Sequence, residues 1–342
     1  MQLPADVRLK LETWDEYMHP PTAAENYNES MYFNLYDAAQ RVGGWFRLGN
    51  RVNEGYAEMT NCLYLPDGSV AFMYHRPHIA HNEAFDAGGM RFSVIEPFQR
   101  LSVHYQGEVL LLKNPGEMID PGRAFKNNPK LPCTVDIHYH GVSPMYGGEP
   151  VHADGSPWRE NPNAGLYLGH YEQHIAGSGT IRVGDREWQV RGLGLRDHSW
   201  GPRYWQNVPW YRWLPMSFSE DFAIMLLDKA LGDGTRIVGG MVLTEGRYDL
   251  VRAVRVESDW DANFYQTRLR AWAKTDRAEY EIEGRVLSLI PLRNRRTSPD
   301  GSELMTRITE GLTEYRCNGR VGYGLSEYLD QIVAGRPVGI GA

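Results

Sequence analysis

The chain has little cysteine: Cys62, Cys133 and Cys317 are the only three in 342 residues. They are far apart in the sequence, odd in number, and form no Cys-x-x-Cys pair. A secreted disulfide framework needs paired cysteines at regular spacing. We therefore expect reduced, unpaired thiols and a cytoplasmic protein.

Long apolar runs and an excess of positive charge are also missing. The longest apolar stretch, Phe222–Leu227, has the length of a buried strand, well short of the roughly 18 residues of a membrane span. The first ten residues contain no apolar core of a signal peptide. A net charge of −7 disfavours nucleic acid or an anionic membrane as the main partner. We expect no integral membrane segment and no nucleic-acid binding.

Several catalytic motifs are absent as well. The sequence has no glycine-rich phosphate loop, no Gly-x-Ser-x-Gly elbow, no His-Glu-x-x-His and no dinucleotide fingerprint. Hydride transfer, phosphoryl transfer and serine hydrolysis therefore have no support, and we expect no cofactor.

What is present is 12% aromatic residues together with 36 glycines, a profile typical of many short strands and turns. Period-two alternation and turns such as Pro66–Ser69 predict about 15 strands without alternating helices, which indicates an all-β protein of barrels or sandwiches. Counting strands divides the chain into residues 1–190 and 191–342. Spacing of three and four predicts a helix over Glu29–Gln40 in the entry segment, and a second helix is expected over Gly322–Ala334.

The most informative stretch runs from Trp188 to Trp213, where half of the ten tryptophans lie. It contains Asp197, His198 and Trp200 within four residues. Neighbouring residues on extended backbone point to opposite faces, so His198 and Trp200 share one face and Asp197 lies on the other. A carboxylate and an imidazole against aromatic rings form an arrangement that shifts pKa values for acid–base chemistry.

We therefore predict a catalytic group around His198 and Trp200, with Asp197 in a supporting position. Asp228 follows the apolar run and is the expected acidic partner, although a strand-end ion pair would explain it equally well. Residues expected to contact the substrate are aromatic or share a polar strand face: Tyr204, Trp205, Trp210, Tyr211, Trp213, Glu172 and His174.

A metal site is the alternative for two period-two patterns, His170-x-Glu172-x-His174 and Asp136-x-His138-x-His140. Imidazole and carboxylate groups on one strand face are suitable ligands. Hydrogen-bonded pairs on a polar strand face explain the same patterns, and we expect no metal.

The segment Gly192–Gly201 resembles the Gly-x-x-x-x-Asp-x-x-Trp-Gly signature of the carotenoid 1,2-hydratase/AttH-like superfamily, which also includes lipocalin-type Diels–Alderases and terpenoid cyclases. The resemblance implies two lipocalin-like antiparallel β-barrels in tandem, with short peripheral helices. In the hydratase branch, the signature histidine and tryptophan act with a downstream Tyr-x-Asp pair. The matching positions are His198, Trp200 and Asp228, with Leu226 where the tyrosine would be.

These observations favour a lyase, isomerase or cyclase of the hydratase–dehydratase type, without cofactor, that acts on a bulky hydrophobic terpenoid-, steroid- or aryl-like substrate. A non-catalytic carrier of an apolar ligand is the second possibility, because barrels of this type bind such ligands. The third is a metal enzyme that uses the His170, Glu172 and His174 face. A homodimer is compatible with the sequence.

Overall fold

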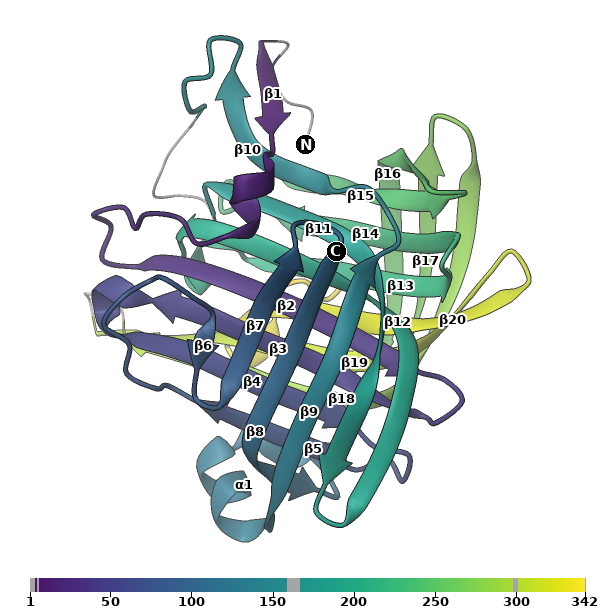
Figure 1. Cartoon of the computed structure of the whole chain (residues 1–342). Coiled ribbons are helices and arrows are strands. Elements are labelled where there is room, and N and C mark those ends of the chain that lie inside the picture. Colours follow the sequence, from purple (N-terminus) through teal and green to yellow (C-terminus); the bar gives the residue numbers. More distant parts are fainter. Residues whose placement is uncertain (1–3, 5, 159–166, 298–300, 342) are drawn as a thin grey trace. The chain divides into compact units, whose positions relative to one another are not determined.

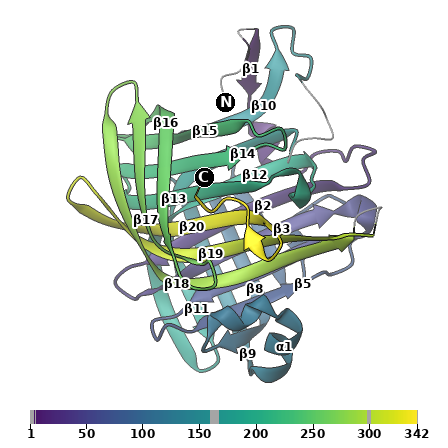
Figure 2. The same cartoon turned by 180° about the vertical axis from the view of Figure 1, so that it is seen from behind.

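The computed structural model describes residues 4, 6–158, 167–297 and 301–341, and most of them form antiparallel strands (Figure 1; Figure 2). The chain divides into two compact units. One unit contains Gln2–Leu112 and Asn128–Tyr204, and we call it the N-terminal unit. The other contains Lys113–Asn127 and Trp205–Ala342, and we call it the C-terminal unit.

Eight strands of the N-terminal unit form a closed ring in the order β11, β12, β2, β3, β4, β5, β8, β9 and back to β11. Shorter strands extend this sheet at its margins. The strands are β1 (Val7–Lys10), β2 (Tyr27–Asp37), β3 (Val42–Arg51), β4 (Tyr56–Tyr64), β5 (Val70–His75), β6 (Asp86–Ala87), β7 (Met90–Glu96), β8 (Arg100–Leu112), β9 (Lys130–Gly141), β10 (Tyr146–His152), β11 (Gly169–Val183) and β12 (Arg186–Pro202).

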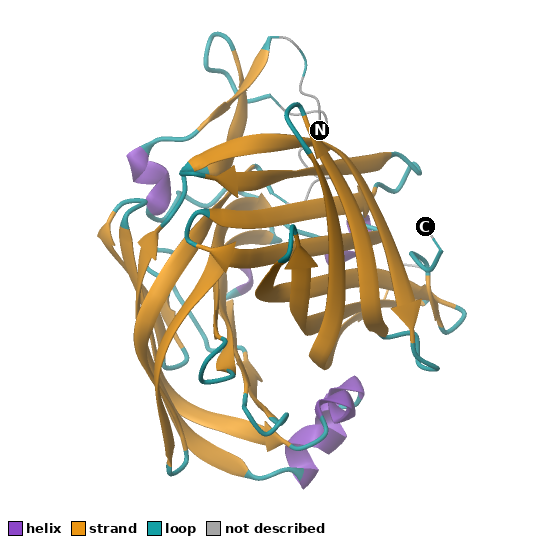
Figure 3. Ribbon diagram, turned by 90° about the vertical axis from the view of Figure 1, so that its right-hand side faces the viewer, coloured by secondary structure: helices purple, strands orange, loops and turns teal. Residues whose placement is uncertain are grey.

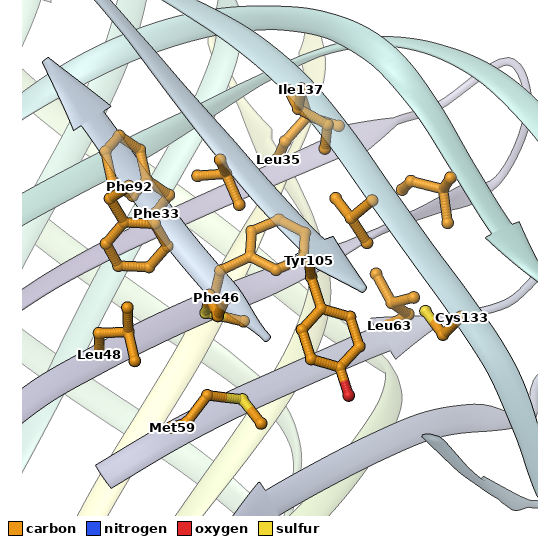
Figure 4. Close-up of a cluster of buried hydrophobic side chains, with 14 of the residues drawn as sticks. Phe33, Leu35, Phe46, Leu48, Met59, Leu63, Phe92, Tyr105, Cys133 and Ile137 are labelled. Carbon is orange, nitrogen blue, oxygen red and sulfur yellow. The ribbon is translucent and has the colours of Figure 1, made fainter. Parts of the chain in front are cut away.

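The interior of this barrel is filled with apolar side chains, some of which are drawn in Figure 4. Alternate residues of each strand point inward because side chains on a strand alternate between its two faces. On β2 the inward residues are Met31, Phe33 and Leu35, all buried. Because these side chains occupy the interior, the barrel is a packed core at this level.

The C-terminal unit is a second antiparallel ring, since β13 pairs with β20 as well as with β14. Its core contains Leu214, Leu226 and Tyr328. An ion pair between Asp120 and Arg293 (3.7 Å) joins the 113–127 segment to this unit. The strands are β13 (Trp210–Ser219), β14 (Phe222–Ala230), β15 (Arg236–Thr244), β16 (Arg247–Trp260), β17 (Gln266–Thr275), β18 (Glu279–Thr297), β19 (Glu303–Cys317), β20 (Arg320–Val333) and β21 (Arg336–Pro337).

Helices are few and short (Figure 3). They are η1 (Thr13–Glu16), η2 (Val52–Glu54), η3 (Pro115–Ile119), α1 (Pro121–Asn127) and η4 (Trp205–Asn207). The predicted class, two tandem lipocalin-like antiparallel barrels with short peripheral helices, is confirmed. Among the described residues, no helix has the length and apolar character needed to cross a membrane.

The two longer predicted helices are wrong. Glu29–Gln40 lies largely in β2, and Gly322–Ala334 lies largely in β20. Both strands have a partner on each side, so the ladder satisfies their backbone groups from two directions. β2 is buried on both faces, which removes the polar–apolar alternation that marks a strand and leaves a chance helical spacing.

The domain boundary predicted near residue 190 falls inside β12, whereas the compact units change between Tyr204 and Trp205. The three cysteines are unpaired, as expected, and all three are buried. The Pro66–Ser69 segment makes the predicted turn between β4 and β5, with Gly68 at φ 84°.

Candidate functional site

Strand β12 presents the signature segment to both faces of the N-terminal sheet. In register with its neighbours, His198 lies between Tyr171 of β11 and Met31 of β2, and Asp197 lies between Glu172 and Tyr32. Since Met31 belongs to the barrel core, His198 and Trp200 point into the barrel and Asp197 points outward. The predicted opposition of Asp197 and His198 is therefore confirmed.

Glu29 is the centre of the polar group inside the barrel. Its Oε1 lies 3.0 Å from Nε2 of His198 and 2.7 Å from Nδ1 of His19. Oε2 accepts hydrogen bonds from Asn82 (2.6 Å) and from the Tyr27 hydroxyl (3.2 Å). The backbone N–H of His19 is 3.0 Å from both oxygens. This buried carboxylate is thus surrounded by donors from three separate chain segments.

Burial disfavours a charged carboxylate, but the hydrogen bonds and charges of His19 and His198 outweigh this cost and lower the pKa of Glu29 to about 2. Burial likewise opposes the charged form of His19. Hydrogen bonds with Glu29 and Asp15 outweigh that cost and raise its pKa. Glu29 is therefore ionised at neutral pH, and hydrogen bonds with His19 and His198 offset the cost of burying its charge.

Trp200 forms the aromatic wall of this group. Its ring stacks on His19 with centroids 3.8 Å apart and meets His198 edge-on at 5.4 Å. The other nitrogen of His19, Nε2, lies 3.2 Å from Asp15. Phe85 also packs edge-on against His198. The rings exclude water and hold both imidazoles in place.

A second buried network continues from His198. Its Nδ1 is 3.2 Å from the Tyr171 hydroxyl, which donates to Glu16 (2.8 Å). Glu16 forms a two-bond ion pair with Arg196 (2.6 and 2.9 Å), and Arg196 also donates to Gln173. Burial opposes the ionised form of Glu16, but Arg196 outweighs it and lowers its pKa. His198 is 0% exposed and has a side-chain partner on each ring nitrogen.

The outward face of the same strands contains a more open pair. Oδ2 of Asp197 lies 3.9 Å from Nε2 of His170, and each side chain is 23% exposed. The ring of Tyr167 stacks on His170 with centroids 4.7 Å apart. Tyr32 is directly opposite Asp197 on β2. An imidazole, a carboxylate and aromatic rings therefore meet at a place that solvent reaches.

Burial disfavours the charged imidazolium of His170, but Asp197, Tyr167 and Glu172 outweigh it and raise the pKa of His170 to about 9. His170 is thus a protonated, partly exposed acid at neutral pH. His174, four residues along the same strand face, is buried, and burial lowers its pKa to about 3, so it is neutral. Glu172 is buried between them.

Asp228, the expected acidic partner, lies on β14 in the C-terminal unit. Its two oxygens are engaged by Arg236, with Nε 2.7 Å from Oδ1 and Nη2 2.5 Å from Oδ2. This ion pair occupies both oxygens of the carboxylate. The structure therefore has the strand-end ion pair that was the alternative explanation for Asp228, and its partner is Arg236.

The aromatic residues predicted to contact substrate belong to both units. Tyr204 ends the N-terminal unit, and the other four belong to the C-terminal unit. Trp210, Tyr211 and Trp213 are buried on β13, and Trp205 is partly exposed in η4. Trp210 packs near the Arg212 guanidinium, 5.3 Å from the ring centroid. Tyr211 donates to Glu327.

Close packing of β12 against its neighbours explains why three positions in this region are glycine. A Cβ on Gly169 would lie 2.1 Å from the ring of Trp200, its partner on β12. A Cβ on Gly192 or Gly194 would lie 2.3 or 2.0 Å from a backbone oxygen of β2. Strand β12 therefore approaches its neighbours too closely for any larger residue at these positions.

Sequence reasoning missed Glu29, His19 and Glu16, because the entry segment was expected to be helical and peripheral. It considered His170 as a metal ligand or as part of a hydrogen-bonded pair on a polar strand face, and not as a proton donor. The available signal was the alternation of Glu29, Met31, Phe33 and Leu35, which would have placed Glu29 inside a barrel.

Comparisons with known proteins agree with this architecture. The family model described as "Domain of unknown function (DUF7064)" matches residues 12–332. The structure is similar to that of an AttH candidate from Nitrosomonas europaea, with a TM-score of 0.58, 14% identity, and coverage of 90% of this chain and 94% of that one. It is also similar to CghA crystallised with Sch210972, with a TM-score of 0.54, 10% identity, and coverage of 95% and 98%.

No curated protein matches the sequence at a significant level. The family model spans most of the chain, and the solved structures share its fold across both units. The chain therefore belongs to the DUF7064 family, a domain of unknown function, and shares the fold of these two solved structures.

Proposed function

We propose that this protein is an acid–base enzyme of the lyase, isomerase or cyclase type, and that His170 is its proton donor. The observation that carries the proposal is the His170–Asp197 pair: a partly exposed imidazole held protonated by a carboxylate 3.9 Å away. Perturbed titratable groups in accessible positions are typical of catalytic sites. Such chemistry needs no redox or organic cofactor.

In this proposal His170 gives a proton to a double bond or to a leaving hydroxyl group, and Asp197 stabilises the imidazolium beforehand. Hydration, dehydration and double-bond shifts each require one proton delivered and one removed. The Tyr167 ring stacked on His170 favours an apolar, bulky substrate such as a terpenoid, steroid or aryl compound. Positioned proton transfer contributes about 10²–10⁴-fold to the rate of such reactions.

His198 and Trp200 have a different role in this account. Both are buried in the network around Glu29, and they are adjacent in sequence to Asp197 and Ser199. We assign them as positioning residues that fix β12, so that Asp197 stays beside His170. A simple carrier function is less well supported, because apolar side chains occupy the interior of the N-terminal barrel.

Deuterium transfer to carbon tests this function. The protein is incubated in D₂O with a panel of unsaturated and hydroxylated terpenoids, steroids and aryl compounds, and products are analysed by mass spectrometry. We expect deuterium at carbon in at least one compound, and a loss of about 10²–10⁴-fold in the rate with His170→Gln. The matched control is His138→Gln, since His138 also faces an aspartate, Asp136 at 3.8 Å, but is well exposed. Equal rates in the two variants would contradict the proposal.

A further inference from the structure

We infer that His19, Glu29 and His198 form a binding site for one divalent transition-metal ion, with Zn²⁺ the best match to the ligand set. The inference is independent of the proposed function, because the acid–base pair lies on the opposite face of β12. It concerns the interior end of the N-terminal barrel, where three chain segments meet.

The ligand atoms already converge. One nitrogen of each imidazole and one oxygen of Glu29 lie within 4.8 Å of one another, and all three residues are buried. Among the described residues, these are the three His, Cys, Asp or Glu residues whose ligand atoms converge in this way. His170, Glu172 and His174, the face considered from sequence, are not gathered in this way. Two imidazoles and one carboxylate are a common ligand set for zinc and related ions.

The surroundings of the three ligands are those of a metal centre. A histidine that binds a metal usually donates its second N–H to a carboxylate or other acceptor, which fixes the ring. His19 uses Nδ1 toward Glu29 and Nε2 toward Asp15 (3.2 Å). His198 uses Nε2 toward Glu29 and Nδ1 toward the Tyr171 hydroxyl (3.2 Å). Both rings therefore aim one nitrogen at the same carboxylate oxygen and have the other anchored.

Glu29 is oriented in the same manner. Asn82 and Tyr27 engage Oε2, which directs Oε1 toward the two imidazoles. Ligand atoms of a tetrahedral zinc ion lie roughly 3.3 Å apart, given bond lengths near 2.0–2.1 Å. The present separations of 2.7 and 3.0 Å from Oε1 are a few tenths of an ångström shorter than this, and the two imidazole nitrogens lie within 4.8 Å of each other. The stacked Trp200 ring supplies the apolar wall that shields such a site from water.

An ion here would join His19 in the entry segment to β2 and β12. Structural metal sites stabilise folds by tying together segments that are distant in sequence. The expected role is therefore to close this end of the barrel, and removal of the ion is expected to loosen the entry segment before the rest of the unit.

The test uses the full-length protein. Wild-type protein is stripped with a chelator and dialysed against low-micromolar free Zn²⁺ or Co²⁺, and bound metal is counted by mass spectrometry. We expect one ion per chain, and X-ray absorption of the zinc form should show two imidazoles and one carboxylate oxygen. This spectrum needs no variant, so it remains decisive if a substituted protein fails to fold.

Variants then locate the site. His19→Gln and His198→Gln are expected to lose the ion, and Asp15→Asn, which removes an outer partner, is expected to weaken affinity about 10–100-fold. His138→Gln and His170→Gln should retain one ion per chain. Absence of bound metal in the wild type, undiminished binding in His19→Gln and His198→Gln, or a spectrum without imidazole would each overturn the inference. Activity is not a readout here, so failure of this site leaves the proposed function untouched.

Discussion

Asp197 and His198 are adjacent in sequence but belong to two different polar groups. Asp197 lies 3.9 Å from His170 on a face that solvent reaches, whereas His198 lies 3.0 Å from Glu29 in the closed end of the barrel. The alternation of side chains along β12 makes this separation unavoidable. One strand therefore fixes both a titratable pair outside and a charged network inside.

The first prediction is that Asp197 raises the pKa of His170. We expect a value of about 9 in the wild type, and a lower value in Asp197→Asn because the stabilising carboxylate is lost. Since the pKa is raised on folding, the stability that this group contributes is complete below about pH 6.5 and is lost as the pH rises through about 9. Histidine NMR titration measures the value, and an unchanged pKa in Asp197→Asn would show that the pair is not coupled.

The buried ion pair of Glu16 and Arg196 gives a stability prediction. Glu16→Gln leaves the fully buried guanidinium of Arg196 without its counter-charge, so the free energy of unfolding should fall by about 3–5 kcal/mol. Replacing both residues, as in Glu16→Gln with Arg196→Met, should recover part of this loss because no unpaired charge remains. Urea unfolding measures both. A double variant no more stable than the single one would contradict this explanation.

Gly169 tests the packing of the signature tryptophan. Gly169→Ala places a methyl group 2.1 Å from the Trp200 ring, so we expect a loss of about 1–3 kcal/mol in unfolding free energy. Gly232→Ala is the control, since a Cβ there meets no atom within 4 Å. Adding Trp200→Phe, which has a smaller ring, should recover part of the loss. Equal stability of the two alanine variants would show that Trp200 adjusts freely.

Replacing Asp228 tests whether His170 or Asp228 is the proton donor. Its partner Arg236 is 42% exposed, so Asp228→Asn should cost only about 1 kcal/mol of stability after solvent screening. Deuterium transfer should remain close to the wild-type rate, because Arg236 occupies both oxygens of Asp228 and His170 is the proposed donor. A loss as large as that in His170→Gln would restore Asp228 to the catalytic group.

The sequence contained enough information for the all-β class and for the faces of the signature strand, because alternation in β12 is regular and its turns are marked by glycine and proline. The sequence pattern gave a wrong prediction of secondary structure where a strand is buried on both faces. In β2 the outward positions also include the aromatic residues Tyr32 and Tyr36, so the inward series Met31, Phe33 and Leu35 was hidden and Glu29 was overlooked.

Pairings between distant segments were also beyond the reach of the sequence. His19 and Glu29 meet His198 only because β2 and β12 are neighbours in the ring, although the segments are far apart in the chain. The partner of Asp228 could not be chosen from spacing either, since Lys229 was closer in sequence than Arg236, which forms the ion pair.

In the proposed reaction, protonated His170 delivers the proton. The most direct measurement is the rate of deuterium transfer to carbon as a function of pH, in the wild type and in Asp197→Asn, with whichever compound of the panel the wild type labels. We predict that the wild-type rate falls above about pH 9 and that the fall moves to lower pH in Asp197→Asn. A pH profile that is the same in both proteins would contradict the account.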